Sequence, residues 1–380
     1  MPLPIWSELF GQQEAIATLE TAVRNKRDSL HHAWLFTGPP GSGRSNAAIA
    51  FAAALVCPND GCGTCQSCIL AMAGGHPDIE VLATEKVQIS IEEVRALVQS
   101  SQLGGTMSRY KIMIIEDADR MKDRTSNVLL KALEEPPPGT VWILCAPSEA
   151  DMIATVRSRV RRVALKTPSV EEVAELLVSR DKIDRKLALV TAAESQSHIG
   201  MARRLATSPE ARARRHETLN AALAINSVSA AVHTAQRWLD LAKKDAEALI
   251  AERDEEELRA LKVMLGVQDE DRVPPHVRAD IKNLEDAQKK RATRSMRDGL
   301  DRILVDLLSL YRDILMIQLG AQAPLVNQEL VAGLNKIAAA SSAEQTIFRI
   351  DQIEVARGRI DDNVNTLLAL EALAVNLRNK

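Results

Sequence analysis

The segment GPPGSGRS, from Gly38 to Ser45, decides the fold of this 380-residue chain. It follows the apolar run Ala33–Thr37 and leads into a helical pattern that starts at Ser45. A glycine-rich loop between a strand and a helix holds phosphate, because backbone N–H groups at the helix N-terminus point at the anion. A purely structural turn is the alternative. The helix and the acidic strand that follow favour the phosphate loop.

The loop fits the nucleotide-binding spacing G-x-x-x-x-G-[K]-[ST] with one departure. Gly38, Gly41 and Gly43 form the expected backbone cradle, and the Ser45 hydroxyl is the candidate contact for Mg²⁺. Arg44 stands where lysine is usual. Its guanidinium keeps the charge but is larger and planar, so it crowds the phosphate pocket. We therefore expect binding of ATP and Mg²⁺ to survive more readily than hydrolysis.

The run KIMIIEDAD, from Lys111 to Asp119, supplies an apolar strand that ends in acidic residues. In the usual order an aspartate orients the magnesium shell and the next residue, a glutamate, positions water. Here Glu116 and Asp117 stand in the opposite order. Each exchange moves a carboxylate by about one methylene, and misplacements near 1 Å cost on the order of a hundredfold in rate. Glu116 and Asp117 are therefore degenerate catalytic candidates.

Four cysteines lie within twelve residues directly after the loop helix, with the spacing C-x4-C-x2-C-x2-C. Four thiolates suit tetrahedral Zn²⁺, and a closed shell of four sulfurs leaves no open position for catalysis. We therefore predict a structural zinc site. An iron–sulfur cluster and reduced free thiols are the alternatives. The candidate ligands are Cys57, Cys62, Cys65 and Cys68.

The composition favours helices and limits the choice of partners. Hydrophobic residues make up 46% of the chain but aromatic residues only 3%, so alanine and leucine supply most of the apolar content. The net charge of −3 leaves nucleic-acid contact to local basic patches. Neither a signal peptide nor a membrane-spanning run is visible, so we expect a cytoplasmic protein without membrane contact. In a reducing compartment, clustered cysteines favour a metal over disulfides.

Apolar runs alternate with helical patterns over roughly the first 165 residues, which predicts a parallel sheet covered by helices. The sequence from Pro209 onward is helical, with a charge-rich stretch from Leu239 to Arg302 that is broken by Pro274 and Pro275. Solvated helix faces explain this stretch, and a surface that binds a partner or DNA is the alternative. The expected strands are Ala33–Thr37, Ile79–Ala83, Lys111–Glu116, Val141–Ala146 and Val160–Leu165, and the expected helices between them are Gln13–Arg27, Ser45–Val56, Ile91–Ser101 and Ser126–Glu134.

Two further local patterns lie beyond the expected sheet. Ser169 is a candidate helix N-cap with Glu172 as its capping-box partner. A basic run follows, and we expect it to form a solvated helix surface, with DNA contact as the alternative. Its arginines are Arg203, Arg204, Arg212, Arg214 and Arg215.

Taken together, these features resemble the bacterial clamp-loader family of AAA+ proteins. The resemblance is carried by the phosphate loop, the cysteine insert, the acidic strand, the segment LLKALEEPP (Leu129–Pro137) and the pair Ser158 and Arg159. It implies an α/β plus all-α fold. A parallel-sheet P-loop domain would span residues 1–166 with a zinc module at 57–68, a helical lid 167–208, and a helical collar 209–380.

The resemblance also implies a mechanism. The family forms a hetero-pentamer in which gamma/tau and delta subunits open a sliding clamp on primed DNA, as part of the DNA polymerase III holoenzyme. Arg159 matches an arginine that reaches the ATP site of a neighbouring subunit, with Val160 in place of a cysteine. Gly11 and Gln12 resemble the segment that lines the adenine pocket, and Arg203 falls at a phosphate-sensing position.

A sensor Thr or Asn is replaced by the run CAPS, which places Pro147 at the sensor position. Proline offers neither an N–H nor a hydroxyl to a phosphate. With Arg44 and the Glu116–Asp117 order, this is a third departure from a working ATPase. The pattern favours a stator, a subunit that serves its neighbours and has no polymerase chemistry of its own.

Three rival roles explain less of the sequence. A gamma/tau motor subunit is expected to keep the lysine, the Asp-Glu order and a sensor threonine. A Holliday-junction helicase motor has no use for the cysteine cluster. A zinc-ribbon DNA-binding regulator needs basic and aromatic residues within the cluster, and the segment from Cys57 to Cys68 contains neither.

Overall fold

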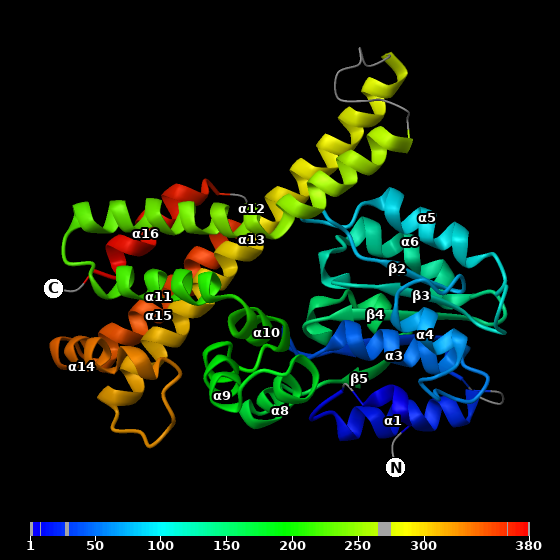
Figure 1. Ribbon diagram of the computed structural model, residues 1–380, viewed down its shortest axis with the longest axis horizontal. Helices are drawn as coiled ribbons and strands as arrows, with labels where there is room; N and C mark the ends of the chain where they lie inside the picture. The colour runs from blue at the N-terminus through cyan, green and yellow to red at the C-terminus, as the bar shows by residue number, and fades with distance from the viewer. Residues whose placement is uncertain (1–2, 8, 27–29, 265–274, 363, 379–380) are drawn as a thin grey trace. The chain divides into compact units, whose positions relative to one another are not determined.

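A computed structural model shows that the apolar segments predicted as strands form one parallel five-stranded sheet (Figure 1). The structure describes residues 3–7, 9–26, 30–264, 275–362 and 364–378. The spatial order of the strands is β2-β3-β4-β1-β5. The strands are β1 (Ala33–Thr37), β2 (Ile79–Leu82), β3 (Lys111–Ile115), β4 (Thr140–Ala146) and β5 (Arg161–Ala164).

Helices cover both faces of the sheet, as a central parallel sheet requires. Along β1, Trp34 and Phe36 belong to the apolar cluster on the side of α1 and α3, whereas Leu35 belongs to the cluster on the side of α5 and α6 (Figure 1). The carboxyl ends of β1, β3 and β4 meet at one edge, where ligands bind in such sheets. The flanking helices are α1 (Gln13–Arg24), α3 (Arg44–Val56), α4 (Gln66–Met72), α5 (Ile91–Ser101), α6 (Asp123–Glu134) and α7 (Ala154–Arg157).

The predicted sheet is confirmed, and the differences from the predictions are shifted element ends and one additional helix. Every predicted strand is present, with each end within one residue of its expected position. Helix α6 begins at Asp123, three residues before the predicted Ser126, because an acidic residue in the first turn complements the helix dipole. Helix α4 was not predicted. Its N-cap is the Cys65 thiol, which accepts a hydrogen bond from the Cys68 backbone N–H.

Three short helices follow the sheet and enclose a small apolar core of their own, which includes Val173, Leu177 and Ala192. The predicted capping box is confirmed, since the Ser169 hydroxyl accepts from the Glu172 N–H and the Glu172 carboxylate accepts from the Ser169 N–H. The helices are α8 (Val170–Asp181), α9 (Arg185–Glu194) and α10 (Ile199–Thr207).

The chain divides into two compact units, Met1–Thr207 and Ser208–Lys380. The finer division into sheet, lid and collar domains stays a prediction. The described residues of the second unit form helices and connecting loops without a strand, and its core includes Trp238, Leu304 and Tyr311. None of the described helices is long and apolar enough to cross a membrane. The helices of this unit are α11 (Pro209–Leu223), α12 (Val228–Met264), α13 (Pro275–Gln318), α14 (Val331–Ala340), α15 (Ala343–Asp361) and α16 (Thr366–Asn376).

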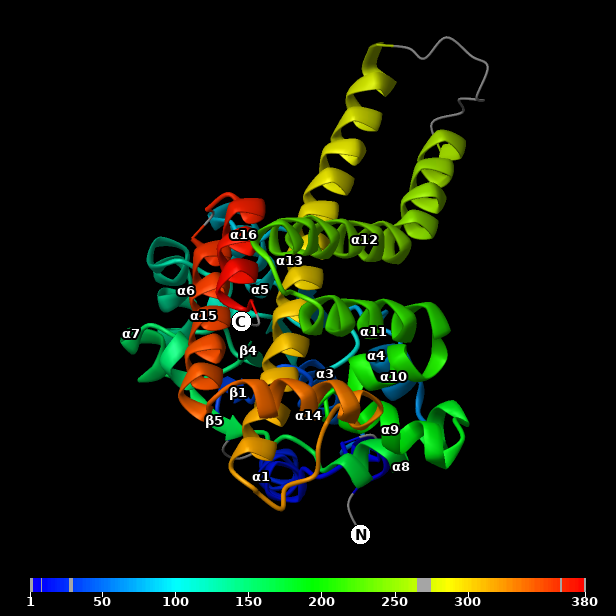
Figure 2. The same ribbon diagram turned by 90° about the vertical axis from the view of Figure 1, so that its left-hand side faces the viewer.

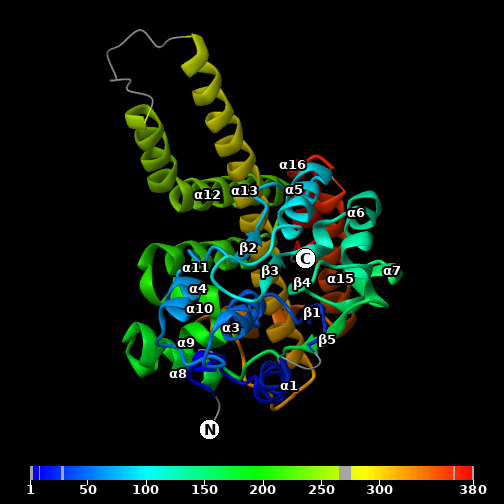
Figure 3. The same cartoon turned by 90° about the vertical axis from the view of Figure 1, so that its right-hand side faces the viewer.

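The charge-rich stretch corresponds to the outer parts of α12 and α13, which run side by side beyond the other helices of this unit (Figure 2 and Figure 3). Pro274 lies outside the described residues, and Pro275 is the first residue of α13. The two helices are joined by Arg291, whose side chain is 9% exposed and pairs with Asp254 at 3.1 Å and with Glu257 at 2.6 Å. The expectation of purely solvated faces is therefore wrong for Arg291.

The basic run extends over α10 and α11, and part of it differs from the expectation of a solvated surface. Arg203 on α10 is 59% exposed, but Arg215 on α11 is 5% exposed and pairs with Asp306 at 3.0 Å. Arg215 also donates to the Asn327 side chain at 2.5 Å. Arg214 forms an ion pair with Asp245. These guanidinium groups stabilise the second unit internally, so they are not a solvated basic surface.

Candidate phosphate loop and metal centre

The predicted phosphate loop has the backbone of an anion-binding turn. It leaves the carboxyl end of β1, and Gly43 is the N-cap of α3. Gly41 and Gly43 have φ angles of +81° and +88°, a region that favours glycine. A Cβ atom at Gly41 would collide with the ring of His198, so the start of α10 lies directly against the loop. The first turn of α3, which contains Ser45, stays the predicted phosphate contact.

The Arg44 side chain folds back onto its own loop. Its Nη1 donates to the carbonyl oxygen of Gly38 at 2.7 Å, and its Nη2 lies 3.8 Å from the Asp117 carboxylate. The side chain is only 12% exposed. The Arg44 guanidinium is therefore engaged by the carbonyl of its own loop and by the acidic segment after β3.

The two acidic candidates follow β3 directly, as predicted. Asp117 has a φ of +49° and also lies 3.5 Å from Arg120. Two residues later, burial raises the pKa of Asp119, and the neighbouring Asp117 charge raises it further. Glu116 is half-buried, and its backbone N–H donates to the carbonyl of Leu82. The acidic groups thus lie beside Arg44, with Asp117 engaged by it.

Gly11 and Gln12, which were predicted to line an adenine pocket, contact other segments of the N-terminal unit. Gln12 is 2% exposed, and its side chain exchanges two hydrogen bonds with the backbone of Lys166, at 2.8 and 3.0 Å. It also donates to the carbonyl of Ser42 in the loop at 3.4 Å. Gly11 has a φ of +70° and lies against the Glu172 carboxylate. Gln12 therefore joins the loop to the segment that leads into α8.

The two residues predicted at sensor positions, Pro147 and Arg203, both contact other residues of the protein. Pro147 follows β4, and its carbonyl accepts from the Gly38 N–H at 3.1 Å, so the CAPS run lies beside the loop. Arg203 on α10 pairs with Asp181 of α8 at 3.0 Å. In this conformation the Arg203 guanidinium connects α10 to α8.

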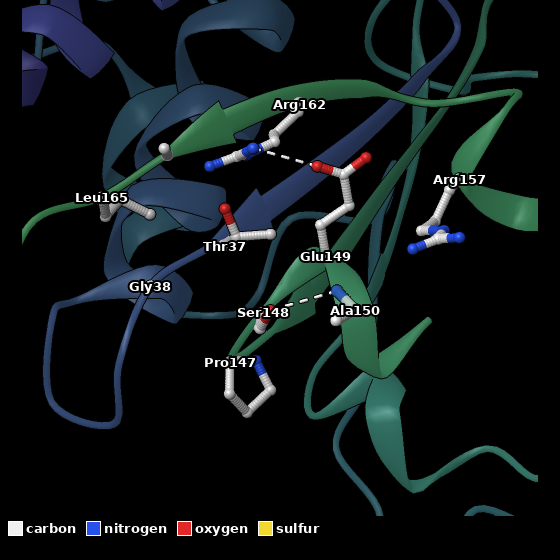
Figure 4. Close-up of a pocket in the computed structure, with 10 residues that line it drawn as sticks. Thr37, Gly38, Pro147, Ser148, Glu149, Ala150, Arg157, Arg162 and Leu165 are labelled. Carbon is white, nitrogen blue, oxygen red and sulfur yellow. Dashed lines mark hydrogen bonds and ion pairs between the residues drawn. The ribbon is translucent and has the colours of Figure 1, made fainter. Parts of the chain in front are cut away.

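A hollow of about 560 Å³ lies at the carboxyl ends of β1, β4 and β5, beside the start of the loop (Figure 4). Thr37 and Pro147 line it from the sheet edge, and Arg157 lines it from α7. Arg162 crosses the hollow to an ion pair with Glu149 at 3.0 Å (Figure 4). Its lining is polar and basic, which makes it a wet surface hollow.

Arg159, the arginine predicted to act in trans, follows α7. Its Nη1 donates to the Thr155 carbonyl at 2.6 Å and to the Ser158 hydroxyl at 3.0 Å. Its Nη2 pairs with Glu134, the last residue of α6, at 2.6 Å. The Arg159 side chain is 34% exposed, so the guanidinium is held in place but still reaches solvent.

The four predicted cysteine ligands converge, with every sulfur within 4.8 Å of every other. Cys57 Sγ lies 3.7 Å from Cys62 Sγ and 3.6 Å from Cys65 Sγ. Four sulfurs around Zn²⁺ at about 2.3 Å are separated by roughly 3.8 Å, so the cluster fits a tetrahedral ion. Cys57 is the C-cap of α3 and Cys68 lies in α4. The cluster can therefore hold a metal ion that joins these two helices.

The cysteine thiols differ in their surroundings. Hydrogen bonds from the backbone N–H groups of Thr64 and Cys65 lower the pKa of Cys62 to about 6. Burial raises the pKa of Cys65 and of Cys68. Backbone donors to sulfur are typical of sites built around thiolate charge.

Three residues at these sites were missed in the sequence. His198 lies against Gly41, and Glu134 holds Arg159. Lys26 donates to the carbonyl of Cys57 at 2.9 Å and pairs with Asp60 at 2.8 Å, beside the cysteine cluster. Only Glu134 carried a signal, because it lies within the LLKALEEPP segment. The other two lie far along the chain from the motifs that they contact.

Comparisons with known proteins agree with this geometry. A family model described as "DNA polymerase III, delta subunit" matches residues 11–169. The delta' subunit of DNA polymerase III from Bacillus subtilis is 25% identical over 378 residues, which cover 98% of each chain. The delta' subunit from Pseudomonas aeruginosa is 36% identical over 183 residues, 46% of this chain and 50% of that protein.

A second subunit type also matches part of the chain. The gamma/tau subunit of Mycobacterium tuberculosis is 29% identical over 159 residues, 40% of this chain and 27% of that protein. Among solved structures, a gamma subunit-related protein from Thermotoga maritima aligns with a TM-score of 0.38 at 17% identity, over 95% of this chain and 99% of that one. The Thermotoga maritima RuvB motor aligns with a TM-score of 0.38 at 19% identity, over 68% of this chain and 83% of that one.

Proposed function

Because this chain belongs to the clamp-loader family of AAA+ proteins, we propose that it acts as the delta-prime stator of a DNA polymerase III clamp loader. In this role it assembles with gamma/tau and delta subunits and helps them to load a sliding clamp onto primed DNA. It contributes Arg159 to the ATP site of a neighbouring subunit. Its own ATPase activity is weak or absent.

The main support for this assignment is a hydrogen bond from the Arg44 guanidinium to the Gly38 carbonyl, within the loop that would hold the nucleotide. Hydrolysis requires a cation on the terminal phosphates and an ordered pair of acids. Here the cation contacts its own loop, and Asp117 pairs with it. Arg159, by contrast, lies at the surface.

In this proposal Arg159 supplies a positive charge in trans. As charge develops on the transferring phosphoryl group, a guanidinium within hydrogen-bond reach stabilises it. Such arginines contribute about 10³ to 10⁵ in rate in other systems. Three contacts fix the Arg159 side chain, and a guanidinium has five N–H donors, so donors remain for a phosphate.

The metal has a structural role in the same proposal. The cysteine cluster fits Zn²⁺, which when bound cross-links the end of α3 to the start of α4. Four sulfur ligands leave no position for substrate. ATP with Mg²⁺ is at most a static ligand of the loop, with Ser45, Gly11, Gln12 and Arg203 as its candidate contacts.

The motor role typical of gamma/tau is the alternative. The gamma/tau matches cover 45% and 40% of the chain, whereas one delta' subunit matches over 98% of it. The lysine, Asp-Glu order and sensor threonine of the motor are replaced by Arg44, Glu116–Asp117 and Pro147.

Steady-state ATP hydrolysis tests the proposal, measured on this chain alone and after mixing with a gamma/tau subunit that carries an intact loop. We expect no turnover from the chain alone and a large loss in the mixture when Arg159 is replaced by Ala. Arg124→Ala is the matched control, because Arg124 is an exposed residue on α6. Turnover by this chain alone at the rate of the motor subunit would favour the alternative.

A further inference from the structure

The LLKALEEPP segment has no role in the proposed mechanism, yet its Glu134 makes the ion pair with Arg159. We propose that Glu134 is a positioning residue for Arg159, which holds the guanidinium in the geometry needed for the neighbouring ATP site. This inference rests on the proposed stator function.

The Arg159 guanidinium contacts two negative features, a helix carbonyl and a carboxylate. Helices α6 and α7 pack against each other, and both end beside it. The C-terminus of a helix carries partial negative charge on its unpaired carbonyls, and the Thr155 carbonyl of α7 accepts from Arg159 Nη1. The Glu134 carboxylate takes Nη2. Two different nitrogens are therefore anchored to two different helices, which fixes both the position and the plane of the guanidinium.

Glu134 occupies a position that its own helix disfavours. It is the last residue of α6, where a carboxylate opposes the helix dipole and a cation is preferred. A residue placed against a local rule commonly marks a functional requirement. Here the requirement is the orientation of Arg159, because Glu134 is 46% exposed and makes no other ion pair in the described parts of the chain.

Two neighbouring residues show that the contact is selective. Glu135, next in the sequence, is exposed and forms no side-chain hydrogen bond or ion pair within the described residues. Arg157, two residues before Arg159, faces the hollow beside Thr37 (Figure 4). Among the four residues Glu134, Glu135, Arg157 and Arg159, only Glu134 and Arg159 form an ion pair with each other.

The strength of this pair suits a positioning role. Pairs of partly exposed charges contribute up to about 1 kcal/mol, which corresponds to a factor of about five in rate if the pair matters fully in the transition state. An interaction of this strength is enough to order the Arg159 side chain. It is too weak to prevent a triphosphate from binding the Arg159 guanidinium. We therefore expect a modest effect on catalysis and little effect on assembly.

The test uses this chain mixed with the motor subunit, and compares kcat and KM for ATP. Glu134→Gln keeps the size of the side chain and removes its charge, so kcat should fall by up to about fivefold with KM unchanged. Glu134→Asp should restore part of kcat, and Glu135→Gln should match wild type. In an Arg159→Ala background, Glu134→Gln should have no further effect, because the pair is already broken. Thermal melting and size-exclusion chromatography confirm that each variant folds and assembles.

The outcomes separate this inference from the function on which it rests. If Arg159→Ala lowers kcat while Glu134→Gln leaves it unchanged or raises it, the positioning role is wrong and the stator function stands. If Glu134→Gln still lowers kcat in the Arg159→Ala background, Glu134 acts through another residue and the inference is overturned. If Arg159→Ala leaves kcat unchanged, the contribution in trans fails, and the positioning role fails with it.

Discussion

Arg44 donates a hydrogen bond to the carbonyl oxygen of Gly38, six residues earlier in the same loop. The motif assigns the side chain at this position to the nucleotide, but here that side chain is hydrogen-bonded to the loop itself. A guanidinium at this position has a carbonyl partner and a nearby carboxylate before any phosphate arrives.

Replacing Arg44 by Lys should free the loop. The ammonium is smaller and would reach terminal phosphates, so ATP binding should tighten by roughly tenfold, the value of one charged hydrogen bond of about 1.4 kcal/mol. Hydrolysis should stay slow, because Pro147 and the Glu116–Asp117 order are unchanged. Titration with a fluorescent ATP analogue measures the affinity. Equal tightening in Arg44→Ala would show that removal of the guanidinium suffices and that the lysine charge is unnecessary.

The cysteine cluster should hold one Zn²⁺ per chain. Cys65→Ser removes a thiolate ligand but keeps a hydroxyl at the N-cap of α4, so the metal content should fall and the melting temperature should fall with the loss of metal. Metal analysis by mass spectrometry and thermal melting provide the measurements. Cys145→Ala is the control for loss of a buried thiol, because Cys145 lies in β4 and outside the cluster. Full zinc content in Cys65→Ser would exclude a four-sulfur site.

Arg215 should be a strong stabiliser of the second unit. Arg215 is buried and Asp306 is only 15% exposed, so Arg215→Ala breaks a largely buried pair, which costs about 3–5 kcal/mol. Urea unfolding gives the free energy. The comparison variant is Arg237→Ala, whose pair with Glu217 is exposed and should contribute at most about 1 kcal/mol. Similar losses in the two variants would contradict the importance of burial.

Asp78 should make stability depend on pH in the acid range. Burial raises the pKa of Asp78, but hydrogen bonds from Thr106, Met107 and Ser108 outweigh it, and the net shift is downward. The stabilisation is therefore complete above the unfolded pKa of about 3.9 and is lost as the pH falls through the lower folded value.

Asp78→Asn should destabilise the protein by about 1–3 kcal/mol at pH 7, because buried N–H donors lose a charged acceptor. The difference from wild type should shrink as the pH falls below about 4. Urea midpoints across this range measure it, with the exposed Asp151→Asn as control. A difference that stays constant down to pH 2 would contradict the assigned pKa shift.

The sequence was sufficient for the sheet, because its strands are short apolar runs separated by helical patterns. The metal cluster was equally accessible, since all four ligands lie within one short segment. Contacts between distant segments were not accessible. His198 against Gly41 and Arg215 with Asp306 depend on how helices pack, and neither pair leaves a local pattern. Helix α4 was missed because its cap is a thiol, which propensity rules do not count among N-caps.

Helix α3 begins at the phosphate loop and ends at Cys57. Its 13 residues form a rod of about 20 Å. Apart from its first turn, most of its side chains are buried, so it has little freedom to bend or shift alone. The cysteine cluster and the glycine-rich loop are therefore the two ends of one rigid helix, and a displacement of Cys57 along the helix axis would displace Gly43 as well.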